Sequence, residues 1–274
     1  MLLAIDTGNT QTVIGLYGDG NASHELLDHW RIATVGDRTC DEHALLFQEF
    51  LAFHGFTLHA DPGRDRGAPG AVLDGGTIDG VAISSGVPRV TAELRAMTTR
   101  YFGFPALVLE PGVRTGMPIL YDNPKEVGAD RIANAVAAYE LYGGPSIVVD
   151  FGTANTIEAV SERGEYLGGA IFPGIDISMD ALFARAAALR RVELVAPRHV
   201  IGKSTVESIQ AGCVYGFSGQ VDALVDRFQA ELGECTVVAT GGLADPIIEH
   251  SRTIQHYEPW LTLQGLRIVF ERNR

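Results

Sequence analysis

The sequence predicts a duplicated α/β fold in which each half of the chain builds its own mixed β-sheet. Two similar segments carry this prediction, AIDTGNTQT from Ala4 to Thr12 and VVDFGTANT from Val148 to Thr156. Each has a short apolar run, then an aspartate, a glycine and small hydroxyl or amide residues. Further strand patterns and then helix patterns follow both segments. We expect two domains, 1–122 and 123–274, with a deep central cleft between them.

The first half alternates short apolar strands with two helices. Strands are predicted at 2–6, 12–17, 24–33, 80–85 and 105–109. Thr39 to Glu42 form a capping box, after which Leu45, Leu46, Phe50 and Phe53 recur at helical spacing. A second helix is expected to place Val90, Leu94, Met97 and Tyr101 on one face. The Gly- and Pro-rich stretch 59–77 predicts a flexible surface loop.

The second half repeats this plan. Strands are predicted at 146–150, 154–160, 165–172 and 237–239. Asn123, Pro124 and Glu126 suit the start of a helix that would run to about Tyr142. Ser204 and Glu207 open a long capped helix, and residues 261–270 form a terminal one. Glycines of the long helix, at 212, 216 and 219, allow either close packing within the chain or a dimer interface.

The composition limits the classes of partner. The 274 residues include 21 basic and 34 acidic side chains, which gives a net charge of −13. This balance argues against nucleic-acid binding, because that binding requires basic residues that neutralise phosphates. A nucleotide would need a metal ion and backbone N–H groups to offset the repulsion.

The sequence also indicates a cytoplasmic location. No apolar run approaches the roughly 20 residues of a membrane-spanning helix, and MLLAID lacks the basic start of a secretory signal. The cysteines, Cys40, Cys213 and Cys235, are far apart and form no CxxC pair. This spacing is typical of a reducing compartment and predicts no zinc site.

The repeated segment has the chemistry of a phosphate clamp. Asp6 and Asp150 each follow a strand, so their carboxylates are expected to project into the cleft and suit a hydrated divalent cation. Gly8 and Gly152 let backbone N–H groups approach a ligand closely. Side-chain hydrogen-bonding groups for phosphate come from Asn9, Thr10, Thr12, Thr153, Asn155 and Thr156. One such turn is weak evidence, but two in equivalent positions are specific.

A second group of polar residues interrupts the alanine-rich helix after Pro124. Asp130 and Asn134 are one turn apart, and Gly128 precedes the acid. The group is either a solvated surface pair or a ligand site, and the glycine favours a ligand site. There Asp130 would accept a proton from a substrate hydroxyl and Arg131 would hold an anion. The GKST stretch at 202–205 is no Walker loop, because Pro197 occupies the position of its first glycine.

Taken together, these motifs resemble the type III pantothenate kinases, in the superfamily of acetate and sugar kinases, actin and heat-shock ATPases. The resemblance runs from Met1 to the C-terminal LTLQGLRIVFERN. Its motifs are AIDTGNT, Tyr121-x-Asn123-Pro124, VGADRIANAVAAY, VVDFGTANT, GEYLGGAIFPGI, IGKSTVESIQAG and ATGG. It implies two ribonuclease-H-like (actin-like ATPase) domains. The chain departs from the family pattern at Asn155, Ser204 and Ile157-Glu158. At these positions the family frequently has threonine, asparagine and Phe-Asp.

The resemblance also implies an activity and site residues. The chain would phosphorylate pantothenate to 4′-phosphopantothenate with ATP and Mg²⁺, the first step of coenzyme A biosynthesis. Asp6 would lie near Mg²⁺, Asp150 would hold K⁺ or NH₄⁺, and Asp130 would be the general base. The ATP-binding residues would be Asp6, Thr7, Gly8, Asn9, Thr10, Gln11, Thr12, Val13 and Thr153. Pantothenate would contact Tyr121, Gly128, Ala129, Asp130, Arg131 and Thr205, and Thr205 would reach the partner's pocket in a homodimer.

Three other functions stay open from the residues alone. A kinase for a different small alcohol would need the same phosphate clamp. A phosphohydrolase would use water in place of the alcohol. A nucleotide-dependent switch or regulator would need no general base, so the intact Asp130 argues against it.

Overall fold

The computed structural model describes residues 1–18, 25–53, 55, 58–59, 71–73, 76–186 and 188–274. Its first sheet contains β1 (Leu2–Thr7), β2 (Gln11–Tyr17), β3 (Leu26–Ala33), β7 (Gly80–Ser85) and β8 (Leu107–Val108). Its second sheet contains β9 (Ser146–Phe151), β10 (Ala154–Val160), β11 (Tyr166–Pro173), β12 (Thr236–Thr240) and β13 (His256–Tyr257). Nine of these ten strands match predicted ones, with boundaries that differ by a few residues, and β13 was not predicted.

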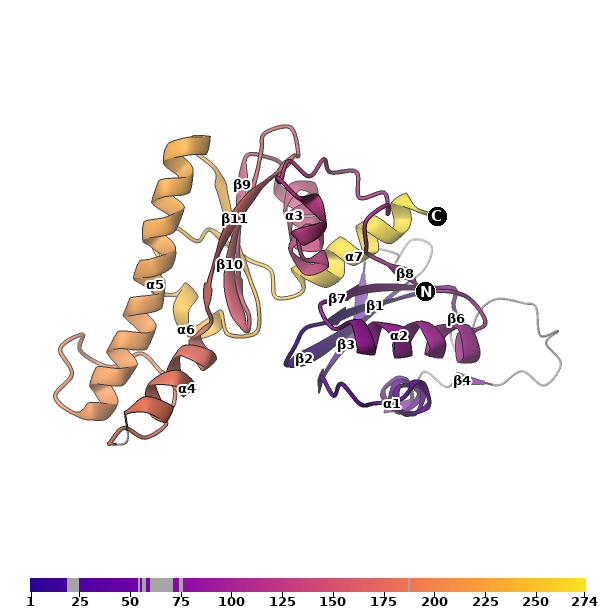
Figure 1. Cartoon of the computed structure of the whole chain (residues 1–274), viewed down its shortest axis with the longest axis horizontal. Coiled ribbons are helices and arrows are strands. Elements are labelled where there is room, and N and C mark those ends of the chain that lie inside the picture. Colours follow the sequence, from indigo (N-terminus) through magenta and orange to yellow (C-terminus); the bar gives the residue numbers. More distant parts are fainter. Residues whose placement is uncertain (19–24, 54, 56–57, 60–70, 74–75, 187) are drawn as a thin grey trace. The chain divides into compact units, whose positions relative to one another are not determined.

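The two sheets have the same topology (Figure 1). Their strand orders are β3-β2-β1-β7-β8 and β11-β10-β9-β12-β13. In each, the first three strands pair antiparallel and the other two join in parallel. The predicted α/β fold of two duplicated ribonuclease-H-like domains is therefore confirmed.

A third, small sheet corrects the predicted loop at 59–77. It is antiparallel and consists of β4 (Leu58–His59), β5 (Ala71–Leu73) and β6 (Gly76–Ile78). The segments AVL and GTI are only three residues long, and the many glycines and prolines around them favoured a loop. The rest of the predicted loop, 60–70 and 74–75, lies outside the described residues.

Helix α1 (Cys40–Phe53) begins at the predicted capping box, since the Thr39 N–H donates to Glu42 Oε2 at 2.8 Å. The residues noted for their helical spacing meet the core only in part, since Phe50 packs against it while Phe53 is 81% exposed. The buried residues are His43, Phe47 and Leu51, whereas Leu45 is 61% exposed. The helix carries more apolar residues than one face can bury, so spacing alone did not select the face that meets the core.

Helix α2 (Pro88–Met97) buries Val90, Leu94 and Met97, as predicted. It continues into a π-helical turn, η2 (Thr98–Phe102). The wider turn buries Phe102 and leaves Tyr101 47% exposed, so Tyr101 is not on the core face.

The helix predicted from Asn123 is divided in two. Residues Pro124–Glu126 form a 3₁₀ turn, η3, and α3 runs from Ala129 to Tyr142. Gly128 therefore precedes α3, and Asp130 lies in its first turn. This corrects the prediction that the Gly128–Arg131 group interrupts a continuous helix.

The remaining helices are α4 (Ile175–Arg185), α5 (Thr205–Leu232), α6 (Asp245–Ile248) and α7 (Leu261–Arg272). The capping box of α5 forms as predicted, because Ser204 accepts from the Glu207 N–H. Helix α5 packs on the face of the second sheet that presents Ile147 and Val149. No helix in the described part of the chain combines the length and apolarity needed to cross a bilayer.

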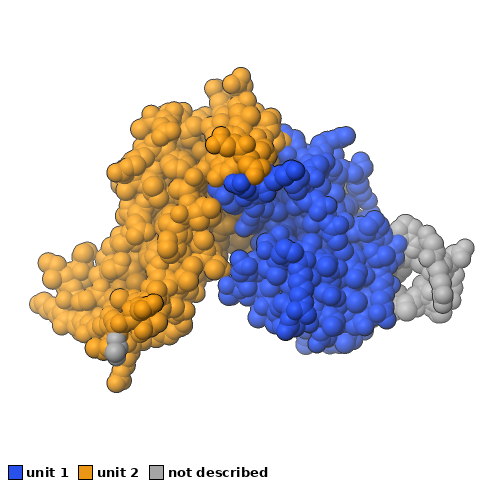
Figure 2. Space-filling view, viewed as in Figure 1, with its two compact units in different colours: residues 1–116, 125–133, 262–274 blue, residues 117–124, 134–261 orange. Residues whose placement is uncertain are grey.

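The backbone forms two compact units (Figure 2). Unit 1 contains 1–116, 125–133 and 262–274, and unit 2 contains 117–124 and 134–261. The predicted domain boundary at residue 122 stays a prediction. Packing groups the residues differently, because each unit contains segments from both sides of residue 122. The C-terminal segment belongs to unit 1 because α7 packs on its sheet.

Contacts of α7 explain this grouping. A β carbon at Gly80 would lie 2.1 Å from the Phe270 ring, and one at Gly15 would lie 2.8 Å from Leu263. Asn273 also exchanges hydrogen bonds with the backbone of Arg114, at 2.8 and 3.2 Å. Glycines on β2 and β7 therefore provide the groove in which α7 lies.

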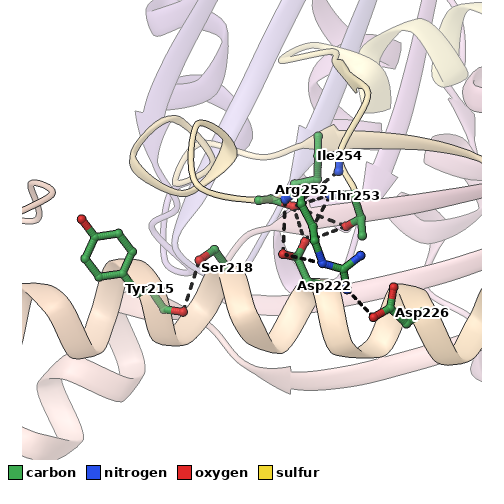
Figure 3. Close-up of polar contacts among 8 residues, drawn as sticks. Tyr215, Ser218, Asp222, Asp226, Arg252, Thr253 and Ile254 are labelled. Carbon is green, nitrogen blue, oxygen red and sulfur yellow. Dashed lines mark hydrogen bonds and ion pairs between the residues drawn. The ribbon is translucent and has the colours of Figure 1, made fainter. Parts of the chain in front are cut away.

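In unit 2, Asp222 of α5 anchors the loop before β13 (Figure 3). It accepts from the hydroxyls of Ser251 and Thr253 at 2.7 and 2.8 Å. Burial opposes ionisation of Asp222, but these hydrogen bonds outweigh it and hold its pKa below the ordinary value. Arg252 in the same loop pairs with Asp226.

Candidate active site

The first repeated segment forms the tight turn between β1 and β2. The Gly8 N–H donates to the Gln11 carbonyl at 3.0 Å, which closes the turn. Asn9, Thr10 and Gln11 are exposed at its tip. Backbone groups and polar side chains are therefore presented to solvent here, as a phosphate-binding turn requires.

Thr34, which the sequence analysis did not identify, fixes this turn. Its hydroxyl donates to the Gly8 carbonyl at 2.8 Å, and its N–H donates to the Thr10 carbonyl at 2.9 Å. Its Oγ1 also lies 2.9 Å from that of Thr12. In the sequence, Thr34 could have been identified only as a hydroxyl residue directly after β3, which antiparallel pairing with β2 brings beside the turn.

Alternation along β1 separates Asp6 from Thr7. Asp6 pairs with Ser84, on the face that Gly80 and α7 share. Thr7 is 1% exposed on the opposite face, and its Oγ1 has no hydrogen-bond partner within the described residues. The side chain of Thr7 therefore belongs to the interior of unit 1, and only its backbone accompanies the turn.

The first turns of α3 lie on the same side of unit 1 as Asp6. Gly265 of α7 packs so closely on Ala133 that a β carbon there would lie 2.0 Å from the Ala133 carbonyl oxygen. One turn before Ala133, Asp130 is exposed, and its Oδ1 accepts from the Arg131 N–H at 2.9 Å. Arg131 is only 8% exposed. An exposed carboxylate with a defined orientation suits a proton acceptor.

Gly128 makes room for the Asp130 carboxylate. A β carbon at Gly128 would lie 2.4 Å from Asp130 Oδ1. Its carbonyl accepts from the Ile132 N–H at 3.1 Å, which starts α3. Gly128 therefore leaves free the space that the Asp130 carboxylate occupies.

The second repeated segment places Asp150 at the end of β9. The Asn134 side chain donates to Asp150 Oδ2 at 2.9 Å. Asn134 is 1% exposed, so the predicted common face of Asp130 and Asn134 divides into an exposed and a buried position. A β carbon at Gly241 would lie 2.6 Å from Asp150 Oδ1, so the ATGG turn closes over the carboxylate.

The hydroxyl and amide residues after Asp150 lie in different environments. Thr153 is exposed, and its carbonyl accepts from the Gly174 N–H at 3.2 Å. Asn155 is fully buried opposite Phe151 and Phe172, and its side chain has no hydrogen-bond partner among the described residues. Asn155 is thus not on the surface as a phosphate donor, because alternation on β10 turns it toward the core.

Two further predicted residues lie elsewhere in unit 2. Tyr121 is half-buried against Tyr166, with ring centroids 6.3 Å apart. Thr205 lies on the rim of a cavity of about 910 Å³ between α4 and the first half of α5. The other residues that line it include Met179, Leu182, Ile209 and Cys213.

Comparison with known proteins identifies the family. The family model described as type III pantothenate kinase matches residues 2–227. The chain belongs to the type III pantothenate kinase family.

Relatives bearing that family name extend over the whole chain. One from Streptomyces avermitilis is 56% identical and one from Thermobifida fusca is 52% identical. The alignments cover 100% of this chain and 98% and 100% of those two relatives. A solved Baf family protein from Campylobacter jejuni is 18% identical, with a TM-score of 0.57 over 99% of this chain and 98% of that one. At that identity the likeness concerns the fold alone.

The carboxylate oxygens of Asp6 and Asp150 are of the type that binds hard cations. No three His, Cys, Asp or Glu side chains gather into a metal-binding group in the described ranges. Mg²⁺ in kinases needs only one or two carboxylates, because substrate phosphates and water complete its shell. Asp6 and Asp150 each offer one carboxylate of that type.

Proposed function

We propose that this chain transfers the γ-phosphate of ATP to the primary hydroxyl of pantothenate and so forms 4′-phosphopantothenate. The observation that carries the proposal is 52–56% identity over the full chain with relatives named type III pantothenate kinase. The acidic composition and free cysteines are in keeping with a small-molecule enzyme of the cytoplasm.

Residues 6–13 and Thr153 bind ATP in this proposal. The turn tip offers backbone N–H groups and exposed polar side chains, and Thr34 holds it in one conformation. Asp6, together with the ATP phosphates, would hold Mg²⁺, which would neutralise negative charge on the phosphates during transfer. A rigid turn favours catalysis because phosphoryl transfer depends on positioning more than on a strong base.

Asp130 accepts the hydroxyl proton of pantothenate, and Arg131 with Tyr121 binds the rest of the substrate. The support for this role is the exposed carboxylate, held at the start of α3 by its own backbone hydrogen bond. Gly128 and Ala129 let the substrate approach closely. Asp150 would hold K⁺ or NH₄⁺, with Asn134 orienting one of its carboxylate oxygens.

The enzyme is a homodimer in this proposal, with Thr205 reaching the partner's pocket. Apolar side chains are exposed around α4, α5 and the segment between them, namely Ile177, Leu182, Val195, Val200, Ile201 and Val206. Added β carbons at Gly212, Gly216 and Gly219 would meet nothing within 4 Å, so close packing within the described chain does not explain them. An apolar surface of this kind is typical of an interface.

Sedimentation tests the dimer. Ile201→Asp is expected to give monomers, because Ile201 is 83% exposed in the single chain and would be buried in the dimer. Leu141→Asp, at an exposed leucine of α3, is the matched control and should stay dimeric. A monomeric wild-type protein at micromolar concentration would contradict the proposal.

The activity is tested with ATP, Mg²⁺ and K⁺, with and without pantothenate, and mass detection of 4′-phosphopantothenate. Asp130→Asn should lower turnover roughly 10²-fold while the fold stays intact. Phosphate release without any acceptor would instead indicate a hydrolase, and activity with other alcohols alone would indicate a different kinase. No release of ADP with any small acid would indicate a nucleotide-dependent switch.

A further inference from the structure

A buried polar pair lies on the second sheet, outside the residues assigned to substrate or ATP. Glu158 and Tyr166 are both 0% exposed, and the Tyr166 hydroxyl donates a hydrogen bond to Glu158 Oε2. A carboxylate with no access to solvent is costly unless such bonds compensate it. The hydrogen bond between Tyr166 and Glu158 therefore compensates the burial of both polar groups.

The neighbouring strand has no side chain where the carboxylate lies. Glu158 pairs with Gly169 of β11. A β carbon at Gly169 would lie 2.1 Å from the Ile157 carbonyl oxygen and 2.5 Å from Glu158 Oε2. Glycine at this position therefore gives the carboxylate the space to reach Tyr166.

Tyr166 in turn holds the segment that leads to Tyr121. Its N–H donates to the Pro118 carbonyl at 2.9 Å, and its carbonyl accepts from the Leu120 N–H at 2.8 Å. Ile119 forms a parallel bridge with Tyr166, so this segment extends the free edge of the sheet at β11. The position of Tyr121 is thus set by the backbone of Tyr166.

The two aromatic rings are also in contact. Their planes meet at 57° with centroids 6.3 Å apart. A β carbon at Gly168 would lie 3.4 Å from the Tyr121 ring, and the φ of +126° at Gly168 is a conformation that favours glycine. Tyr121 therefore rests on the Tyr166 ring and on a bare stretch of β11 backbone.

We infer that Glu158 and Tyr166 are positioning residues that fix the ring of Tyr121 for the acceptor substrate. This inference rests on the proposed role of Tyr121 in the pantothenate pocket. Glu158 holds the Tyr166 phenol by its hydroxyl, so the ring beneath Tyr121 keeps one orientation. Loss of that hydrogen bond lets the Tyr166 ring turn, and Tyr121 then loses its defined support.

The test compares Tyr166→Phe, which removes only the hydroxyl, with the wild-type enzyme. The KM for pantothenate should rise roughly 3- to 10-fold, as expected for the loss of one hydrogen bond, while kcat and the KM for ATP stay unchanged. Glu158→Gln should keep the KM for pantothenate near the wild-type value, because its amide oxygen can still accept a hydrogen bond from Tyr166. Glu158→Met has a side chain of similar length without such an acceptor, so it should raise the pantothenate KM as Tyr166→Phe does. It provides the same test if Tyr166→Phe fails to fold.

A double-mutant cycle separates positioning from general destabilisation. In a Tyr121→Ala background, Tyr166→Phe should change the pantothenate KM by less than twofold, since the support has nothing left to position. Equal effects in both backgrounds, or an unchanged KM in Tyr166→Phe, would overturn the inference. A wild-type chain that does not phosphorylate pantothenate would overturn the proposed function instead, and the assay above decides that separately.

Discussion

Gly128→Ala should displace the proposed general base without unfolding the enzyme. The added β carbon would lie 2.4 Å from Asp130 Oδ1, whereas ordinary contacts begin near 3.4 Å. The carboxylate must therefore withdraw by about 1 Å, and a displacement of that size costs up to about 10²-fold in rate. That loss corresponds to about 2.7 kcal/mol of transition-state stabilisation. The backbone at Gly128 is not left-handed, so alanine fits it without strain.

The assay measures kcat, both KM values and the urea midpoint of Gly128→Ala. We expect kcat to fall between 10- and 100-fold, an estimate set by how far the carboxylate can relax, and stability to change by no more than about 1 kcal/mol. Gly36→Ala is the matched control, because a β carbon at Gly36 meets nothing within 4 Å. A Gly128→Ala enzyme with normal kcat would refute the argument that the position of the Asp130 carboxylate limits turnover.

Three further predictions concern stability and the cation. Burial, reinforced by Arg38, lowers the pKa of His43 to about 4 despite Glu93 and Glu42. As the pH falls below 6.5, the unfolded chain therefore binds this proton before the folded chain does, and the free energy of unfolding falls by about 2 kcal/mol between pH 7 and pH 5. His43→Leu should remove this loss of stability, as measured by urea unfolding. Asn134→Ala should raise the K⁺ concentration for half-maximal activity several-fold, and equal wild-type rates in Na⁺ alone would contradict the cation role of Asp150. Ser251→Ala and Thr253→Ala should each lower the free energy of unfolding by about 1 kcal/mol and leave both KM values unchanged. If the double variant loses the sum of the two single losses, the two hydroxyls do not depend on each other through Asp222.

The sequence predicted nine of the ten strands of the two large sheets, the capping boxes of α1 and α5, and the repeated turns, because these depend on local patterns. The apolar runs of LLAIDT and SIVVDF, and the Ser204 and Thr39 capping boxes, act within a few residues of the chain. Each aspartate was placed correctly at the end of a strand for the same reason. Where apolar residues exceed one face, as on α1, local pattern was insufficient, and contact with α2 and the sheet selected His43, Phe47 and Leu51.

Long-range packing decided the environment of each site residue. The sequence by itself determined which residues could carry the chemistry, the family motifs and the duplicated plan, because these are written in residue types and their spacing. Only the tertiary structure decided that Thr34 holds the Gly8 turn and that Asn134 donates to Asp150. It also decided that α7 returns to unit 1 and that Glu158 meets Tyr166. Each of these contacts joins segments whose distance is set by the packing of strands and helices, which no local pattern in the chain encodes.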